Sequence, residues 1–584
     1  MHSRAFLIAF ALPYAAPALA QSVDVRGVDL PAELQEQLAA ELPKDPAPET
    51  RFEARRQASR AAERLTGYLN SRGYFQAEVR AGVDAGPPPI PFVTVDPGGV
   101  FTLADVSIED LDATLSPGQM AAARAGMDLA LGEAITPRAV IDAEGRLVEA
   151  LVKAGFAFAR LEPRQVLGDR AAETVSITFR VRAGAPVILG EVRFDQGLRM
   201  RRRALEVLVP FEPGTPYSPE LMDTFNSRLG ATRLFSVFGA RLEDMPAARA
   251  PGGATVHDVQ VTLVERDRYT ISAGASFASN EGVGTNAEWT RRNVTRRGDT
   301  LTVRATVAAQ ERSGEVTWSY PHAFGYGWDL GLTAGAGREE TDAFDRENVS
   351  AAASFDIERT PRLGFTFAGA NEFTRETDAV GERDLQIVSV SGAVRIDRTD
   401  VLLDPRRGWR ADLRVEPGTL FGDDSANYVS TVGQASVYQP LAAEARLVAA
   451  LRMRTGFVFG ADQLELPTSR RFFAGGGGSA RGYAFQAIGP EDETGQPLGG
   501  RGLTELSTEL RWRRSNRLGF AAFLDGAAVT ARDAPSLTDM RFGAGLGVRY
   551  YTAIGPLRLD LATPLDPRDG DDPVQVYISI GQAF

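Results

Sequence analysis

Two kinds of hydrophobic periodicity divide the chain near residue 267. Before this point, apolar residues recur at three- and four-residue spacing within Arg51–Leu69, Ile135–Ala154 and Ser218–Leu229, which predicts helices. After it, apolar and polar residues alternate strictly, as in Tyr269–Phe277 and Trp328–Ala336. The pattern therefore predicts an α/β first half and a second half built of strands with unlike faces.

The alternation continues to the end of the chain, through Trp409–Glu416, Phe542–Tyr550, Leu557–Leu561 and Val574–Ile580. A soluble β-sandwich also alternates, but it rarely sustains the pattern over so many residues without a second core. Strands that face lipid on one side must close into a barrel. The segment from Asp267 to Phe584 has 318 residues, which at about 20 residues per strand and connection predicts a transmembrane antiparallel β-barrel of about 16 strands.

The N-terminus has the three parts of a secretory signal peptide. His2 and Arg4 precede the apolar run Ala5–Leu12, and the small-x-small sequence ending at Ala20 precedes Gln21. A membrane anchor is the alternative, but this run is too short to cross a bilayer of about 30 Å. We therefore expect export and cleavage between Ala20 and Gln21.

The first half contains three similar segments, each after a predicted helix. They are LNSRGYFQAEV from Leu69, LVKAGFAFARL from Leu151 and LFSVFGARL from Leu234. In the third, Ser236 stands where the others have Gly73 and Gly155. A second element, FTLADV from Phe101, recurs as VILGEV from Val187 and opens a unit each time. The repeat predicts three small modules with the order strand, helix, helix, strand, strand.

Composition excludes several kinds of site. The chain has no cysteine, which rules out disulfides and thiolate metal ligands, and its net charge of −12 argues against a nucleic-acid partner. The three histidines, His2, His257 and His322, form no ligand cluster in the sequence. We expect no metal, no cofactor and no enzymatic activity.

A connection of about 40 residues separates the strands predicted around Leu447–Gly460 and Leu503–Arg513, far longer than usual. It contains RFFAGGGGSARGYAF, with the glycine run Gly475, Gly476, Gly477 and Gly478. A phosphate-binding loop would need Lys-Ser/Thr after the glycines, and no lysine follows Lys153. A merely flexible surface loop does not explain an arginine, Arg481, flanked by aromatic residues.

If this connection folds into the barrel, Arg481 needs anionic partners, because an unpaired guanidinium removed from water costs several kcal/mol. The alternation turns Glu509 and Asp525 toward the lumen. They could be drawn as paired catalytic carboxylates, but an arginine-rich lumen explains them more simply. We hypothesise that Arg481, held by Asp525 and Glu509, keeps the lumen plugged.

These features resemble a known family. The three modules resemble POTRA domains, and Arg481-Gly482-Tyr483 resembles the loop-six motif of the outer-membrane β-barrel assembly superfamily, the BamA/TamA family. Phe523 and Asp525 match its Phe-x-Asp-x-Gly pattern, with Ala527 in place of the final glycine. Further resemblance covers GVRYYTAIGPLRLDLATPL from Gly547, and the C-terminal β-signal is matched at Tyr577, Gly581 and Phe584. Three POTRA-like modules bring the chain closest to the TamA branch.

The N-terminal pattern, the alternation and the resemblance together predict a signal peptide at 1–20, POTRA-like domains at 21–99, 100–185 and 186–266, and an outer-membrane barrel at 267–584. It implies a periplasmic place for the modules and a function as an insertase or translocase for unfolded outer-membrane or autotransporter clients. Templating of client strands would occur at a lateral barrel seam. Outer-membrane lipid and a TamB-like periplasm-spanning protein would be partners. A two-partner-secretion exporter, a BamA-like paralogue and a passive porin remain alternatives.

Overall fold

The computed structural model describes residues 23–27, 30–43, 45–278, 282–360, 362–402, 404–552, 555–568, 571–580 and 582. The expected cleavage site at Ala20 and Gln21, and Gly581 and Phe584 of the expected β-signal, lie outside the described residues. The chain forms two compact units, and the division between them passes through the third α/β module. Each unit is described by itself.

The first module is a three-stranded sheet with two helices. Its elements are β1 (Asp24–Gly27), α1 (Ala32–Glu41), α2 (Arg51–Ser71), β2 (Glu78–Asp84) and β3 (Ile90–Asp96). The strand order is β1-β3-β2, with β1 parallel and β2 antiparallel to β3. Helix α2 begins where the Thr50 hydroxyl accepts from the backbone N–H of Glu53 and the Glu53 carboxylate accepts from the N–H of Thr50. Leu38, Leu65 and Val93 form part of its core.

The second module repeats this order. Its elements are β4 (Thr102–Asp110), α3 (Pro117–Gly126), α4 (Pro137–Lys153), β5 (Arg160–Asp169) and β6 (Thr174–Arg182). The order β4-β6-β5 again places the last strand in the centre. Both helices start with a hydroxyl cap followed by proline, Ser116-Pro117 and Thr136-Pro137, which satisfies the first free N–H groups.

The third module follows the same plan with a short additional strand. Its elements are β7 (Val187–Phe194), α5 (Arg202–Glu206), α6 (Pro219–Ala231), β8 (Phe235–Leu242), β9 (Ala248–Arg249), η1 (Pro251–Gly253) and β10 (Thr255–Glu265). The order is β7-β10-β8, and β9 pairs with β10. The expected match of Ser236 to Gly73 and Gly155 is wrong, because Ser236 lies within β8. Arg233, with φ +55°, takes the left-handed position that those glycines occupy at φ +96° and +98°.

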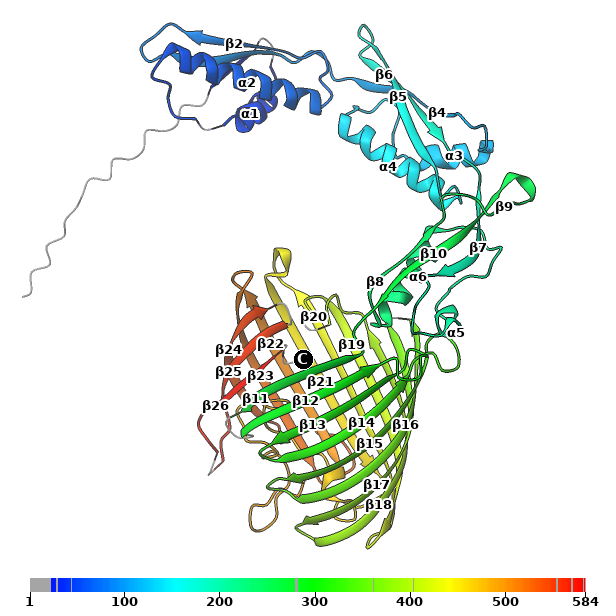
Figure 1. Ribbon diagram of the computed structural model, residues 1–584. Helices are drawn as coiled ribbons and strands as arrows, with labels where there is room; N and C mark the ends of the chain where they lie inside the picture. Colours follow the sequence, from blue (N-terminus) through cyan, green and yellow to red (C-terminus); the bar gives the residue numbers. More distant parts are fainter. Residues whose placement is uncertain are drawn as a thin grey trace, which may run out of the picture. The chain divides into compact units, whose positions relative to one another are not determined.

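The second half closes into an antiparallel barrel of sixteen strands among the described residues, which confirms the expected fold (Figure 1). Its strands are β11 (Tyr269–Ala278), β12 (Gly282–Arg292), β13 (Thr300–Ala308), β14 (Glu311–Tyr320), β15 (Trp328–Glu340), β16 (Asp345–Thr360), β17 (Leu363–Asp378), β18 (Gly381–Asp397), β19 (Gly408–Gly422), β20 (Ala426–Pro440), β21 (Leu447–Phe459), β22 (Gly502–Arg513), β23 (Leu518–Thr530), β24 (Arg541–Thr552), β25 (Gly555–Pro564) and β26 (Gln575–Ile580). Two short 3₁₀ turns, η2 (Ala443–Ala445) and η3 (Thr468–Arg470), lie between strands.

No helix in the described ranges is both long enough and apolar enough to span a membrane.

The two faces of the barrel wall differ as the alternation predicts. Along β25, Leu557, Leu559 and Leu561 are exposed, whereas Arg558 and Asp560 between them are buried. Exposed leucines on the outer face suit contact with lipid, and the buried charges must therefore face the lumen. Some of these buried charges form the site described below.

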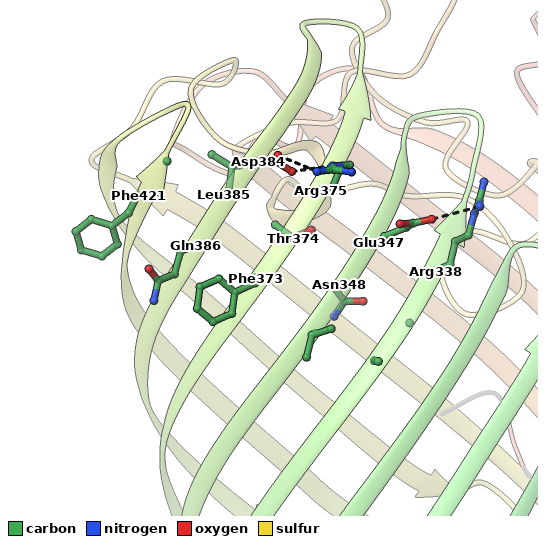
Figure 2. Close-up of a pocket in the computed structure, with 14 residues that line it drawn as sticks. Arg338, Glu347, Asn348, Phe373, Thr374, Arg375, Asp384, Leu385, Gln386 and Phe421 are labelled. Atoms are coloured by element: carbon green, nitrogen blue, oxygen red, sulfur yellow. Dashed lines mark hydrogen bonds and ion pairs between the residues drawn. The ribbon is translucent and has the colours of Figure 1, made fainter.

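The outer wall carries charged side chains near one end of its strands, with Phe373 below them in the view of Figure 2. Arg338 pairs with Glu347 across β15 and β16, and Arg375 pairs with Asp384 across β17 and β18. Exposed aromatic rings, including Phe373, lie beside a groove of about 770 Å³ near these charges. Charges above aromatic and aliphatic side chains are typical of the boundary between lipid head groups and acyl chains.

Candidate functional site

The connection between β21 and β22 folds inward and forms a small core of its own. Short antiparallel bridges join Phe472 with Gly500 and Ala474 with Ile488. A buried cluster combines loop residues with two strand residues: Ala474, Ala480, Tyr483, Ile488, Leu503 and Ala527. The methyl group of Ala527, which departs from the family's glycine, is thus buried against the loop. The connection is therefore a packed plug.

Arg481 lies at the tip of this plug, and its side chain is 2% exposed. Its Nε donates to Oδ2 of Asp525 at 2.6 Å and its Nη2 donates to Oδ1 at 3.1 Å, which is a bidentate pair. The backbone N–H of Arg481 also donates to Asp525 Oδ2, at 3.2 Å. The guanidinium carbon lies 3.4 Å from the centre of the Phe523 ring.

Glu509 is also near Arg481, but its main partner is another arginine. Arg481 Nη2 is 3.6 Å from Glu509 Oε2, whereas Arg549 Nη2 donates to Glu509 Oε1 at 2.8 Å. The third carboxylate at the tip is Asp560, whose Oδ2 accepts from Arg481 Nη1 at 2.9 Å and whose Oδ1 accepts from Arg549. Arg511 Nε also lies 3.4 Å from Glu509, and Arg558 Nε lies 3.4 Å from Asp560. Three buried carboxylates therefore face four buried guanidinium groups, and this network compensates their charges.

Sequence reasoning missed Asp560 and Arg549. The signal was present, because Asp560 lies between Leu559 and Leu561, and Arg549 lies between Val548 and Tyr550 in the alternating pattern. Register then brings them into reach: Gly547 of β24 pairs with Asp560 of β25. Alternation gives the face of each residue but not the residue that it meets on the next strand.

The other two residues of the expected loop-six motif hold the tip against the last strands. Gly482 has φ +106°, and a Cβ at this position would lie 2.8 Å from the carbonyl group of Thr563. Its N–H donates to the Tyr577 hydroxyl at 3.2 Å, and the Tyr483 hydroxyl donates to the carbonyl oxygen of Phe542 at 3.0 Å. Tyr577, expected as part of the β-signal, therefore also contacts the plug.

The glycine run serves as close-packed backbone. The N–H of Gly476 donates to the carbonyl oxygen of Tyr483 at 3.2 Å, and Gly475 donates to the Ser479 hydroxyl at 3.2 Å. A Cβ at Gly477 would lie 2.9 Å from the Tyr577 ring, and the Gly478 carbonyl accepts from Arg452 at 3.3 Å. The glycine run therefore contacts other residues of the plug and two side chains of the barrel wall, Arg452 and Tyr577.

The base of the plug is fixed to a different part of the wall. The backbone N–H groups of Thr468 and Ser469 donate to the Glu376 carboxylate of β17, and the Thr468 hydroxyl donates to Asp378 at 2.6 Å. Arg470 donates to Glu372, also on β17, at 2.5 Å. Because β17 lies six strands from β23, the plug is anchored on two well-separated sectors of the barrel.

The charged residues of this site hold the plug in place by ion pairs and hydrogen bonds. Within the described ranges, no group of three or more histidine, aspartate or glutamate side chains is placed to hold a metal ion. The acidic residues at the tip are bound by arginines that satisfy their charge, and neither Asp525 nor Glu509 has more than 3% of its surface exposed. The site holds a loop inside a barrel.

Comparisons with known proteins agree with this architecture. A profile described as the Omp85 superfamily domain matches residues 293–584. The chain is 24% identical over 450 residues to the outer membrane protein assembly factor BamA of Nitratidesulfovibrio vulgaris, covering 74% of this chain and 55% of that protein. It is 21% identical over 604 residues to BamA of Neisseria meningitidis serogroup B, covering 89% of this chain and 72% of that protein.

Among solved structures, BamA from Haemophilus ducreyi lacking POTRA domains 1–3 has the same fold, with a TM-score of 0.67 and 17% identity over 82% of this chain and 99% of that one. This chain spans about half the length of the first of the two BamA relatives. Its barrel lies in the outer membrane, with the POTRA-like modules in the periplasm. The chain belongs to the Omp85 superfamily.

Proposed function

We propose that the protein assists the assembly of outer-membrane or autotransporter-type proteins by templating their strands at a seam of its own barrel. It catalyses no covalent reaction in this proposal. The observation that carries it is the junction between β11 and β26. There, the described ladder consists of two residue pairs, Phe277 with Ile578 and Ala278 with Tyr577.

The neighbouring ladders are much longer. That between β11 and β12 runs from Tyr269 with Arg291 to Ala278 with Gly282, along the whole of β11. In the membrane, backbone N–H and C=O groups without partners are costly, because lipid cannot hydrogen-bond them. Among the described residues, most of β11 has no partner on β26, and such an edge is a template for an incoming strand.

The plug supports this proposal over a passive porin. A pore needs an open lumen, whereas this loop crosses it and is fixed by Asp525 at the tip and by Glu376 at the base. The POTRA-like modules add sheet edges such as β2 and β5 that can accept a client strand by backbone pairing. Both features suit a protein that handles unfolded chains on the periplasmic side.

A disulfide across the seam tests the function directly, because the chain has no cysteine of its own. We expect the pair Phe277→Cys and Ile578→Cys, once oxidised in proteoliposomes, to abolish assembly of an eight-stranded outer-membrane barrel added unfolded from urea. Reduction should restore assembly. The measurement is the heat-modifiable gel mobility of the client.

The matched control is a disulfide in a continuous ladder, Val316→Cys with Ala334→Cys, where β14 and β15 pair. It should leave assembly unchanged. Equal activity of the oxidised and reduced seam variant would refute templating at this junction and leave export through the pore, as in two-partner secretion, as the better interpretation.

We further propose a TamB-like periplasm-spanning partner, supported by the three POTRA-like modules that precede the barrel. Affinity purification of the full chain from outer membranes should recover a long inner-membrane-anchored protein rich in β-structure. Recovery of barrel-assembly lipoproteins in its place would favour a BamA-like paralogue.

A further inference from the structure

The turn between β18 and β19, described at residues 398–402 and 404–407, carries a carboxylate that binds Gln582, beyond the last strand. The amide Nε2 of Gln582 donates to Oδ1 of Asp404 at 2.8 Å. Arg406 Nη2 donates to the other oxygen of Asp404 at 3.1 Å, and Arg513 Nη1 lies 3.5 Å from it. Asp404 thus ties the last described residue to a turn 178 positions earlier.

Gln582 also faces the charge network at the tip of the plug. Its Oε1 accepts from Arg549 Nε at 3.2 Å. An arginine offers only donors and an aspartate only acceptors, so the two neighbours fix the orientation of the amide. Arg549 in turn binds Glu509 and Asp560, which hold Arg481. A continuous set of polar contacts therefore links the turn, the end of the last strand and the plug.

Hydrogen bonds within the described part of the turn hold the residues that follow Asp404. Oδ1 of Asp400 accepts from the N–H groups of Arg406 at 2.9 Å and Arg407 at 3.2 Å. The N–H of Arg398 donates to the carbonyl oxygen of Trp409 at 2.8 Å, which closes the turn.

The strand order shows that this contact directs Gln582 away from the junction of β26 with β11. In the closed barrel, β18 and β19 are the eighth and ninth of sixteen strands, farthest around the wall from the junction of β26 with β11. If the ladder of that junction continued in register, Ala275 would pair with Ile580 and Ala273 with Gln582. Gln582 instead binds Arg549, which faces the lumen, and Asp404 of the turn. Among the described residues, β11 from Tyr269 to Ser276 has no β26 partner.

We infer that Asp404 is a positioning residue for the seam. By binding Gln582, it holds the end of the last strand in the lumen. The strand then cannot extend its pairing along β11, and the edge of β11 stays available to client strands. This inference rests on the proposed function, since the edge is useful only if clients pair with it. Because the same glutamine contacts Arg549, docking of the plug and opening of the edge are linked.

The test exchanges donor and acceptor. Gln582→Glu places two carboxylates together and should release the strand end. In the double variant, Asp404→Asn with Gln582→Glu, the asparagine amide can donate to the new glutamate carboxylate. That carboxylate still accepts from Arg549. Asp404→Asn alone keeps an acceptor for Gln582 and should resemble the parent. Gln582→Leu removes both hydrogen bonds and should not be rescued by Asp404→Asn. Asp533→Asn, in an exposed turn after β23, is the control.

The readout is a disulfide at the continued register, Ala275→Cys with Ile580→Cys, formed in the full chain in outer membranes and scored on gels. Formation should be slow in the parent, rise about tenfold in Gln582→Glu, as expected for loss of a charge-assisted hydrogen bond, and return to the parent rate in the double variant. Equal rates in Gln582→Glu and the double variant would overturn the inference. If the rates follow the expected order while client assembly does not change, the positioning role stands and the proposed function fails.

Discussion

Asp525→Arg is expected to release the tip of the plug from the barrel wall and to produce the same defect as loss of Arg481. The change removes both side-chain hydrogen bonds to Arg481 and brings a second guanidinium beside it. Breaking a buried ion pair costs about 3–5 kcal/mol, because the remaining charge is left without compensation. The docked plug should therefore give way to an open lumen, seen as larger single-channel conductance in planar bilayers and lost client assembly.

The charge swap provides the internal control for this expectation. Arg481→Asp combined with Asp525→Arg should recover only part of the assembly activity, because the new aspartate would face Asp560 and Glu509. Wild-type conductance and assembly in both single variants would exclude the clamp.

A second control uses the same bidentate geometry at the surface. On the outer wall, Arg375 donates to Asp384 at 2.8 and 3.0 Å, but both side chains are more than half exposed. Such pairs contribute about 0–1 kcal/mol, so Asp384→Arg should leave conductance and client assembly nearly unchanged. The contrast separates an effect of burial from an effect of charge.

The sequence predicts which strand residues of this site face the lumen, because a period of two residues assigns every strand residue to one face. Glu509 and Asp525 could be placed in the lumen for this reason, and the structure brings both to Arg481. The same rule also places Asp560 and Arg549 inward, yet their contact depends on how β24 and β25 are registered. Register is a property of two strands and their turn, which the pattern of one strand does not contain.

Contacts across the lumen are harder to predict from the sequence than contacts between neighbouring strands. Glu376 on β17 and Asp404 after β18 meet a loop and a chain end that are 92 and 178 positions away. Nothing in the local pattern specifies these partners, since both carboxylates resemble ordinary polar residues of a strand end or turn. The misplaced match of Ser236 has a related cause, because Arg233 adopts the left-handed conformation that elsewhere in the repeat is marked by glycine.

Gly543→Ala is expected to displace the plug without removing any charge. Gly543 lies on β24 directly beside Asp525, its register partner on β23. A Cβ at this position would overlap the backbone carbonyl oxygen of Arg481, and no flexible side chain is available to move aside. Overpacking of this kind costs about 1–3 kcal/mol. Conductance should rise, as is expected for Asp525→Arg, although every partner of Arg481 remains.

The matched control is Gly369→Ala in β17, where an added Cβ would meet nothing within 4 Å. Glycine inside a strand is less favourable than alanine by about 0.5–1 kcal/mol, so this variant should lose no stability and should keep the parent's conductance and heat-modifiable mobility. If Gly543→Ala behaves like Gly369→Ala, the tip does not need close approach to β24, and Asp525 would hold Arg481 by charge alone. If only Gly543→Ala opens the lumen, the absence of a side chain at residue 543 is as much a part of the clamp as the carboxylate beside it.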